Sequence, residues 1–315
     1  MEGWSPIVPT RTRPDPEVTA AYSPRRVSES AFIEMRGLRH HLRRWPASDH
    51  AAGTRTVFLL HGWMDVSASF QFVVDLLPPH WTLLAPDWRG FGLSGRTQSD
   101  CYWFPDYLAD LDRLLDRLQP DGAVDLVAHS MGGNIATLYA GLRPQRVRRL
   151  VNLEGVGMPA SDPAEAPARY RAWLDGLQAG ASLRDYASRA AVAERLMKNN
   201  PRLRADQAAF LALHWGIEQP DGRFAPAGDP AHRIVNPILY RLEEALAIWR
   251  EIEAEVLWVL SGQRDAWHAF VGAPAYRERL KAIRRLHEAE VADAGHMMHH
   301  DQPQVVARLI TEFLA

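Results

Sequence analysis

The amino-acid sequence predicts an α/β protein with a mainly parallel eight-stranded sheet and helices on both of its faces. Two observations lead to this prediction. From Val57 onward, short apolar and β-branched runs alternate with stretches of helical periodicity, as in chains of βαβ units. The alternation stops near Met158 and resumes after Val235, which indicates an insertion between the sixth and seventh strands.

The N-terminal part of the chain precedes this alternation. Residues 1–28 are rich in Pro, Arg, Ser and Thr without periodicity, and they are expected to form a flexible tail. The runs 32–36 and 39–45 are separated by Gly37 and predict a β-hairpin.

The core elements follow in order. Strands are expected at 57–60, 82–86, 124–128, 147–153, 256–260 and 286–292. Helices are expected near 67–77 and around 238–242. Three further helices are expected where apolar residues share one helical face: Leu108, Leu111, Leu115 and Leu118; Ile135, Leu138, Tyr139 and Leu142; Val305, Val306, Leu309, Ile310 and Phe313.

Residues 158–235 interrupt the core, which is expected to comprise 29–157 and 236–315. The insertion has no convincing strand pattern, and prolines repeatedly cut its Ala-rich helical pattern. It is expected to form a helical cap over the site. The alternative is that its helices pack on the core without covering a site.

Ser130 lies where one predicted strand meets a helix. The strand-like run 124–128 leads into it, the small residues Ala128 and Gly132 flank it, and helical periodicity starts at once. A nucleophile elbow needs this pattern, because strand end and helix start nearly touch at a strained turn that exposes one hydroxyl. The sequence therefore predicts a nucleophile at Ser130, with Ala128 in place of the first glycine of G-x-S-x-G.

A serine hydroxyl is a weak nucleophile at neutral pH and needs a base within hydrogen-bond reach. His296 is the best candidate, because it lies on a loop between the last strand and the last helix. His299 and His300 are its rivals. Together the three histidines form an H-x-x-H-H string that suggests a metal site, but no acidic or cysteine ligand set accompanies it, and no metal is expected.

The order of these motifs along the chain resembles the order in the α/β-hydrolase superfamily. The resemblance extends from about Phe32 to the C-terminus. Ser130, Asp265 and His296 occur in that fold's order of nucleophile, acid and histidine. The stretch 61–63 (HGW) resembles the superfamily's oxyanion-hole strand end, and 87–94 (DWRGFGLS) its turn after the fourth strand. The stretch 61–133 is also similar to the branch called serine-hydrolase-like proteins, and the insertion has the place of the superfamily's helical cap.

The resemblance implies a role for further residues. Asp265 follows the seventh strand, the usual place of the acid, while Glu154 at the end of the sixth strand is the alternative acid. The oxyanion hole is expected to use the backbone N–H groups of Trp63 and Met131, since fixed dipoles need little reorganisation. The Trp63 indole would then line the pocket; the alternative is a plain core aromatic.

The resemblance also implies an activity. We expect a serine hydrolase that cleaves a small to medium carboxylic ester or lactone through an acyl-enzyme, without metal or organic cofactor. Candidate pocket residues are Trp103, Phe210, Trp215 and Met297. Because they are apolar, uncharged acyl groups are expected to be preferred. The alternatives are a C–C bond hydrolase of the same fold and a ligand sensor that keeps the triad without turnover.

The amino-acid composition limits which binding partners and which cellular location are expected. Hydrophobic residues make up 47% and charged residues 23%, with a net charge of −2, so neither nucleic acid nor an anionic membrane is an expected partner. The expected partner is a small-molecule substrate, with a homodimer left open. The N-terminus lacks a signal-peptide pattern and Cys101 is the only cysteine, so a cytoplasmic location is expected. Arginine can indicate carboxylate or phosphate recognition, but the arginines are scattered along the chain, and general composition is the favoured explanation.

Overall fold

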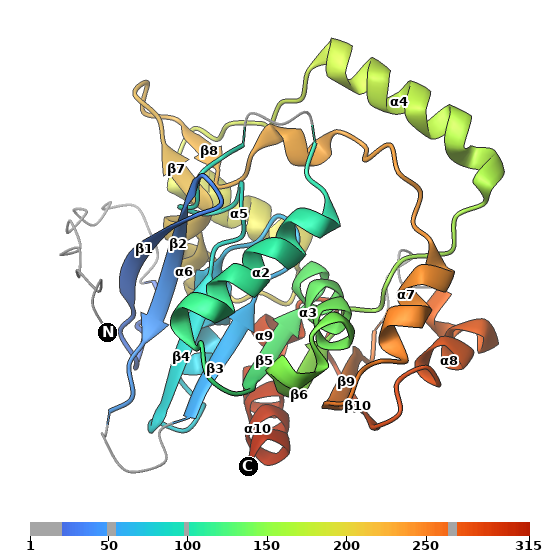
Figure 1. The fold of residues 1–315 in the computed structure, drawn as a ribbon. Helices are drawn as coiled ribbons and strands as arrows, with labels where there is room; N and C mark the ends of the chain where they lie inside the picture. Colours follow the sequence, from blue (N-terminus) through green and yellow to red (C-terminus); the bar gives the residue numbers. More distant parts are fainter. Residues whose placement is uncertain (1–20, 49–54, 98–100, 264–269) are drawn as a thin grey trace.

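The structure is a computed structural model that describes residues 21–48, 55–97, 101–263 and 270–315 (Figure 1). Its centre is a sheet of eight strands in the order β1-β2-β4-β3-β5-β6-β9-β10. The strands are β1 (Glu29–Met35), β2 (Leu38–Trp45), β3 (Arg55–Leu60), β4 (Trp81–Pro86), β5 (Val124–His129), β6 (Val147–Leu153), β9 (Glu255–Ser261) and β10 (Leu286–Val291).

The sheet is mainly parallel. β2 pairs antiparallel with β1 and with β4, and every other neighbouring pair is parallel. The α/β class and the eight-stranded sheet predicted from the sequence are confirmed. In a parallel sheet the strand ends meet at one edge, and here that edge brings together the ends of β3, β5, β6 and β9.

Two apolar layers sandwich the sheet. Alternate residues of a strand point to opposite faces, so Phe58 and Leu60 enter one buried cluster while Val57 and Leu59 enter the other. Helices α2 (Phe104–Leu118), α3 (Met131–Leu142), α7 (Leu242–Trp249) and α8 (Pro274–Leu280) pack in the first cluster. Helices α1 (Gln71–Val74), α9 (Met298–Asp301) and α10 (Pro303–Leu314) pack in the second.

Two predicted helices have different bounds. The helix expected at 67–77 is a 3₁₀ helix, Ser67–Phe70, followed by the single turn α1. The helix expected around 238–242 begins only at Leu242, because the side chain of Asn236 accepts a hydrogen bond from the Ile238 amide and holds a turn there instead.

The inserted segment (158–235) contains helices α4 (Ala166–Ala179), α5 (Arg189–Asn199) and α6 (Ala205–Trp215). It also contains a hairpin, β7 (Gly216–Glu218) and β8 (Phe224–Pro226), which corrects the prediction that this segment has no strand. Strands of three residues are too short to produce a recognisable alternation in sequence. Helices α5 and α6 share a buried cluster with the core residues Val66 and Phe72, whereas α4 has no buried residue and projects away from the sheet (Figure 1).

Residues 21–28 are bound to the core, which corrects the prediction of a flexible tail for this part. The Tyr22 hydroxyl donates to the Asp75 carboxylate at 2.7 Å, and the Arg26 guanidinium donates to the carbonyl of Trp81 at 2.8 Å. Residues 1–20 lie outside the described residues. Within the described parts of the chain, no helix has the length and apolar character needed to cross a lipid bilayer.

Candidate active site

Ser130 sits at a sharp turn between β5 and α3. Its backbone has φ 51° and ψ −116°, a region that costs a non-glycine residue about 1–3 kcal/mol and is typical of functional turns. The Ser130 amide donates to the carbonyl of Leu153 at 2.8 Å, which ties the turn to the end of β6. A methyl group on Gly132 would lie 2.3 Å from the Leu60 carbonyl oxygen, so the helix reaches its close approach to β3 only with glycine there.

His296 lies between Ser130 and Glu154. Its Nε2 is 2.9 Å from the Ser130 hydroxyl, and its Nδ1 is 3.4 Å from Oε2 of Glu154. The structure thus brings together the predicted nucleophile, the predicted base and the alternative acid. Asp265, the preferred acid from the sequence, lies outside the described residues.

Two backbone features hold the Glu154 carboxylate at this place. Glu154 follows β6 with φ 59°, another backbone conformation that non-glycine residues rarely adopt. Its buried carboxylate accepts a hydrogen bond at Oε1 from the Ser261 amide, at 2.5 Å. Because Ser261 ends the neighbouring strand β9, one oxygen is bound to the sheet and the other faces His296.

The two predicted oxyanion donors lie on either side of Ser130. Met131 opens α3, where helix geometry leaves the first N–H groups without an intrahelical acceptor. Trp63 follows Gly62, and a methyl group on Gly62 would lie 3.2 Å from Cβ of Ser130. The residues that follow β3 therefore lie close to Ser130.

His61 fixes this strand end. Its Nδ1 donates to the Gly62 carbonyl at 2.8 Å, while its Nε2 accepts from the Trp88 amide at 2.9 Å. These two bonds require a neutral imidazole, and burial lowers the pKa of His61 to about 4. His61 thus holds the strand end that precedes Trp63, a predicted oxyanion donor, in place.

A cavity of about 460 Å³ lies between the end of β3 and the inserted segment. Trp63, 53% exposed, lines it with Trp215 of α6, so the Trp63 side chain is no plain core aromatic. Phe210 does not line this cavity; it is buried against Phe72, with ring centroids 5.8 Å apart, because its face of α6 packs on the core. Trp103 and Met297 are half-buried and also lie outside the cavity lining.

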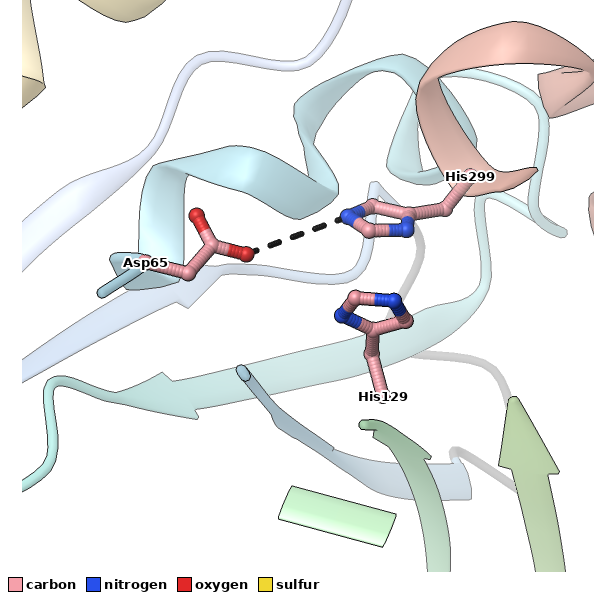
Figure 2. A group of neighbouring side chains, drawn as sticks. All are labelled: Asp65, His129 and His299. Atoms are coloured by element: carbon pink, nitrogen blue, oxygen red, sulfur yellow. Dashed lines mark ion pairs between the residues drawn. The ribbon is translucent and has the colours of Figure 1, made fainter. Parts of the chain in front are cut away.

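Figure 2 shows a buried polar cluster made of Asp65, His129 and His299. His129 Nε2 is 2.8 Å from the carbonyl oxygen of His296, and its ring lies 4.4 Å from that of His299. Figure 2 shows Asp65 facing His299; Oδ2 of Asp65 lies 4.0 Å from Nε2 of His299. One ligand atom from each residue lies within 4.8 Å of the others, so within the described ranges this group is suited to hold a metal ion.

The two rival histidines of the sequence point away from the nucleophile. His299 is fully buried in this cluster, and His300 Nε2 lies 2.6 Å from the Ser69 hydroxyl. Asp65 and His129 were not singled out from the sequence. A carboxylate four residues after His61 in an otherwise apolar stretch was the available signal for Asp65.

These buried side chains make stability depend on pH. Burial lowers the pKa of His300 to about 3 and that of His299 well below its usual value, as it does for His61. Unfolded histidine takes up a proton near pH ~6.5, so stability from these groups is present above that pH and is lost toward pH ~4. Burial also lowers the pKa of His214 and of His232 to about 3, which acts in the same direction. Burial raises the pKa of Asp65 to about 7, which acts in the opposite direction, but it is one carboxyl against five histidines.

We therefore expect the free energy of unfolding to fall on acidification, with each histidine contributing up to about 1.4 kcal/mol per pH unit. Urea unfolding between about pH 7 and pH 5 measures this dependence. His300→Gln is expected to reduce the slope, since it removes one titrating group. An unchanged slope in that variant, or greater stability of the parent in acid, would contradict the assignment.

The chain is similar to several known proteins. Residues 55–225 match the family model described as alpha/beta hydrolase fold. A serine hydrolase-like protein of Danio rerio is 29% identical over 269 residues, covering 82% of this chain and 81% of that protein. The 2-hydroxy-6-oxo-2,4-heptadienoate hydrolase of Pseudomonas putida is 37% identical over 113 residues, which cover 35% of this chain and 40% of the enzyme.

Solved structures share the fold. The thioesterase domain from the curacin biosynthetic pathway superposes with a TM-score of 0.78 at 23% identity, covering 90% of this chain and 99% of that domain. At this identity the likeness concerns the fold alone.

Proposed function

The chain belongs to the α/β-hydrolase fold family, and from this premise we propose that it is a serine hydrolase cleaving a small to medium carboxylic ester or lactone. The observation that carries the proposal is the 2.9 Å contact between the Ser130 hydroxyl and His296 Nε2. A serine becomes an effective nucleophile when a base accepts its proton at this distance. The relatives named serine hydrolase-like proteins agree with it.

The proposed reaction proceeds in two steps. Ser130 attacks the ester carbonyl while His296 takes the hydroxyl proton, and His296 then returns that proton to the leaving alcohol. The N–H groups of Met131 and Trp63 stabilise the negative charge on the tetrahedral oxygen. In the second step, water activated by His296 attacks the acyl-enzyme and releases the acid. The reaction requires no metal or organic cofactor.

Glu154 is the proposed acid, because its free carboxylate oxygen faces His296 Nδ1 at 3.4 Å. It would hold the ring with a proton on Nδ1 and leave Nε2 free to accept from Ser130. Asp265 stays as the prediction from the sequence.

The cavity supports the proposed substrate size. Its volume of about 460 Å³ falls in the range of small-molecule sites, and it is lined by Trp63, which directly follows Gly62. A methyl group on Gly62 would lie 3.2 Å from Cβ of Ser130, so this lining residue is close to the proposed nucleophile. An acyl group of small to medium length fits such a space.

Cleavage of a carbon–carbon bond is the second candidate. It is favoured by the partial match to the Pseudomonas putida hydrolase, whose named substrate is a keto acid without an ester group. The two candidates are separated by assaying aryl esters beside a 1,5-diketo acid. If the protein hydrolyses the esters but releases no carboxylic acid from the diketo acid, the ester hydrolase is favoured.

Labelling with a fluorophosphonate tests the proposal. The reagent is expected to form one adduct, on Ser130, and digestion followed by mass spectrometry locates it. A panel of aryl esters of increasing acyl length then measures turnover. An adduct on another residue would count against the proposal, whereas one round of acylation without turnover would indicate a ligand sensor. Protein unfolded in urea is the control, because its serines lack an activating base.

A further inference from the structure

Three arginines converge on the cavity beside Trp63. Arg195 belongs to α5, and Arg233 ends the 3₁₀ helix Pro230–Arg233. Arg184 lies shortly before Tyr186, which forms a β-bridge with Phe224 of the hairpin strand β8. Arg184 and Arg195 lie 11 residues apart, and Arg233 lies 38 residues further along the chain; the folding of the inserted segment brings all three to one cavity.

The charges of these arginines are not balanced locally. All three side chains are exposed, and none forms a hydrogen bond or ion pair with another residue in the described parts of the chain. The described residues lining the cavity include no Asp or Glu. Some other arginines of the protein are paired: Arg89 bonds to Asp110 and Arg204 to Asp206. The cavity lining is therefore locally positive, although the overall charge of the chain is −2.

The remaining lining of the cavity is mostly apolar and includes Trp63, the residue after Gly62. Val192, Leu196 and Trp215 line it on the side of the inserted segment, and Trp63 lines it beside the proposed oxyanion hole. A ligand in this cavity thus has aliphatic and aromatic contacts for its carbon chain and unpaired cations within the same space.

We propose that this cavity binds an anionic group of the substrate, a carboxylate or a phosphate, through Arg184, Arg195 and Arg233. The inference rests on the proposed function. Guanidinium groups match the geometry of both anions with two parallel hydrogen bonds, and such charge-assisted bonds are among the strongest available. An anionic substrate differs from the uncharged acyl group expected from the sequence, because this cavity adds three guanidinium groups to its aromatic and aliphatic residues.

Arg233 also lines a second cavity of about 500 Å³ along Gly176 of α4. A substrate that passes Arg233 can therefore extend beyond the first cavity. The anionic group can therefore belong to either part of the substrate: a short acyl chain that ends in a carboxylate, or a longer leaving group that carries phosphate.

Two matched substrate pairs test the proposal. The mono-4-nitrophenyl ester of glutaric acid is compared with its methyl ester, which removes the carboxylate charge. Butyryl-coenzyme A is compared with butyryl-pantetheine, which lacks the phosphates together with the nucleoside. We expect the anionic member of at least one pair to have a kcat/KM roughly tenfold or more above its neutral partner. Added salt is expected to reduce this ratio.

Arg184→Gln, Arg195→Gln and Arg233→Gln are each expected to lower that ratio, and the triple variant is expected to bring it close to one. Arg171→Gln is the matched control: this exposed arginine of α4 lies outside both cavity linings, so the ratio is expected to stay at its original value.

A binding measurement separates this inference from the proposed function. Calorimetry with Ser130→Ala reports binding of glutarate monoester and of its methyl ester without turnover. Tighter binding of the anion that is lost in the triple arginine variant supports the inference even where no ester is hydrolysed. Equal binding and equal kcat/KM within both pairs would overturn it, while active turnover of all four substrates would leave the hydrolase proposal standing.

Discussion

Replacing Ser130 with alanine is expected to lower kcat for a simple aryl ester by about 10⁶, the effect of removing the nucleophile in enzymes of this type. The reason is local: the hydroxyl 2.9 Å from His296 Nε2 is the group that forms the covalent intermediate, and a methyl group cannot replace it. Initial rates with 4-nitrophenyl butyrate measure the loss.

The fold is expected to survive this change, since only one oxygen is removed and the Ser130 amide keeps its bond to Leu153. Circular dichroism and a urea unfolding curve check this. Ser161→Ala, in the segment before α4, is the matched control and is expected to retain activity. Turnover by Ser130→Ala at the parent rate would refute the assignment of the nucleophile.

Glu154→Gln is expected to lower kcat by roughly 10⁴, the loss seen when a triad carboxylate becomes an amide. The Ser261 amide donates to Oε1, so the amide oxygen of glutamine takes that position and the NH₂ group takes the position facing His296. That group donates a hydrogen bond to Nδ1 where the carboxylate accepted one. The ring then carries its proton on Nε2 and cannot accept the proton of Ser130.

Asp265→Asn, measured beside it, decides between the two carboxylates. If Glu154 orients His296, the glutamate variant shows the larger loss in kcat. A larger loss in Asp265→Asn would restore the acid expected from the order of motifs in the sequence. Glu165→Gln is the matched control, because this exposed glutamate lies just before α4 and its variant is expected to keep the parent kcat.

The contact between Glu154 and His296 was not derivable from local pattern. From the sequence, Glu154 and Asp265 both follow strands that end at the same sheet edge, and neither can be preferred by distance. The choice depends on the register of β6 and β9, which places the Ser261 amide on Glu154, and on the path of the loop that carries His296.

The strands and the nucleophile elbow could be predicted because their signals are local. A strand buried on both faces has a continuous apolar run, and the turn at Ser130 requires small neighbours within two residues. The same reasoning failed for the hairpin β7–β8 and for the start of α7, where three-residue strands and the Asn236 turn leave little periodicity.

The sequence by itself determined the α/β sheet, its order of elements, and Ser130 and His296 as partners, since these follow from periodicity and from motifs a few residues long. Only the tertiary structure decided which histidines turn inward, that Phe210 packs in the core, that Glu154 faces His296, and that three arginines of the inserted segment share one cavity. These depend on how separate segments pack against one another, and spacing along the chain does not encode the distance between residues brought together by that packing.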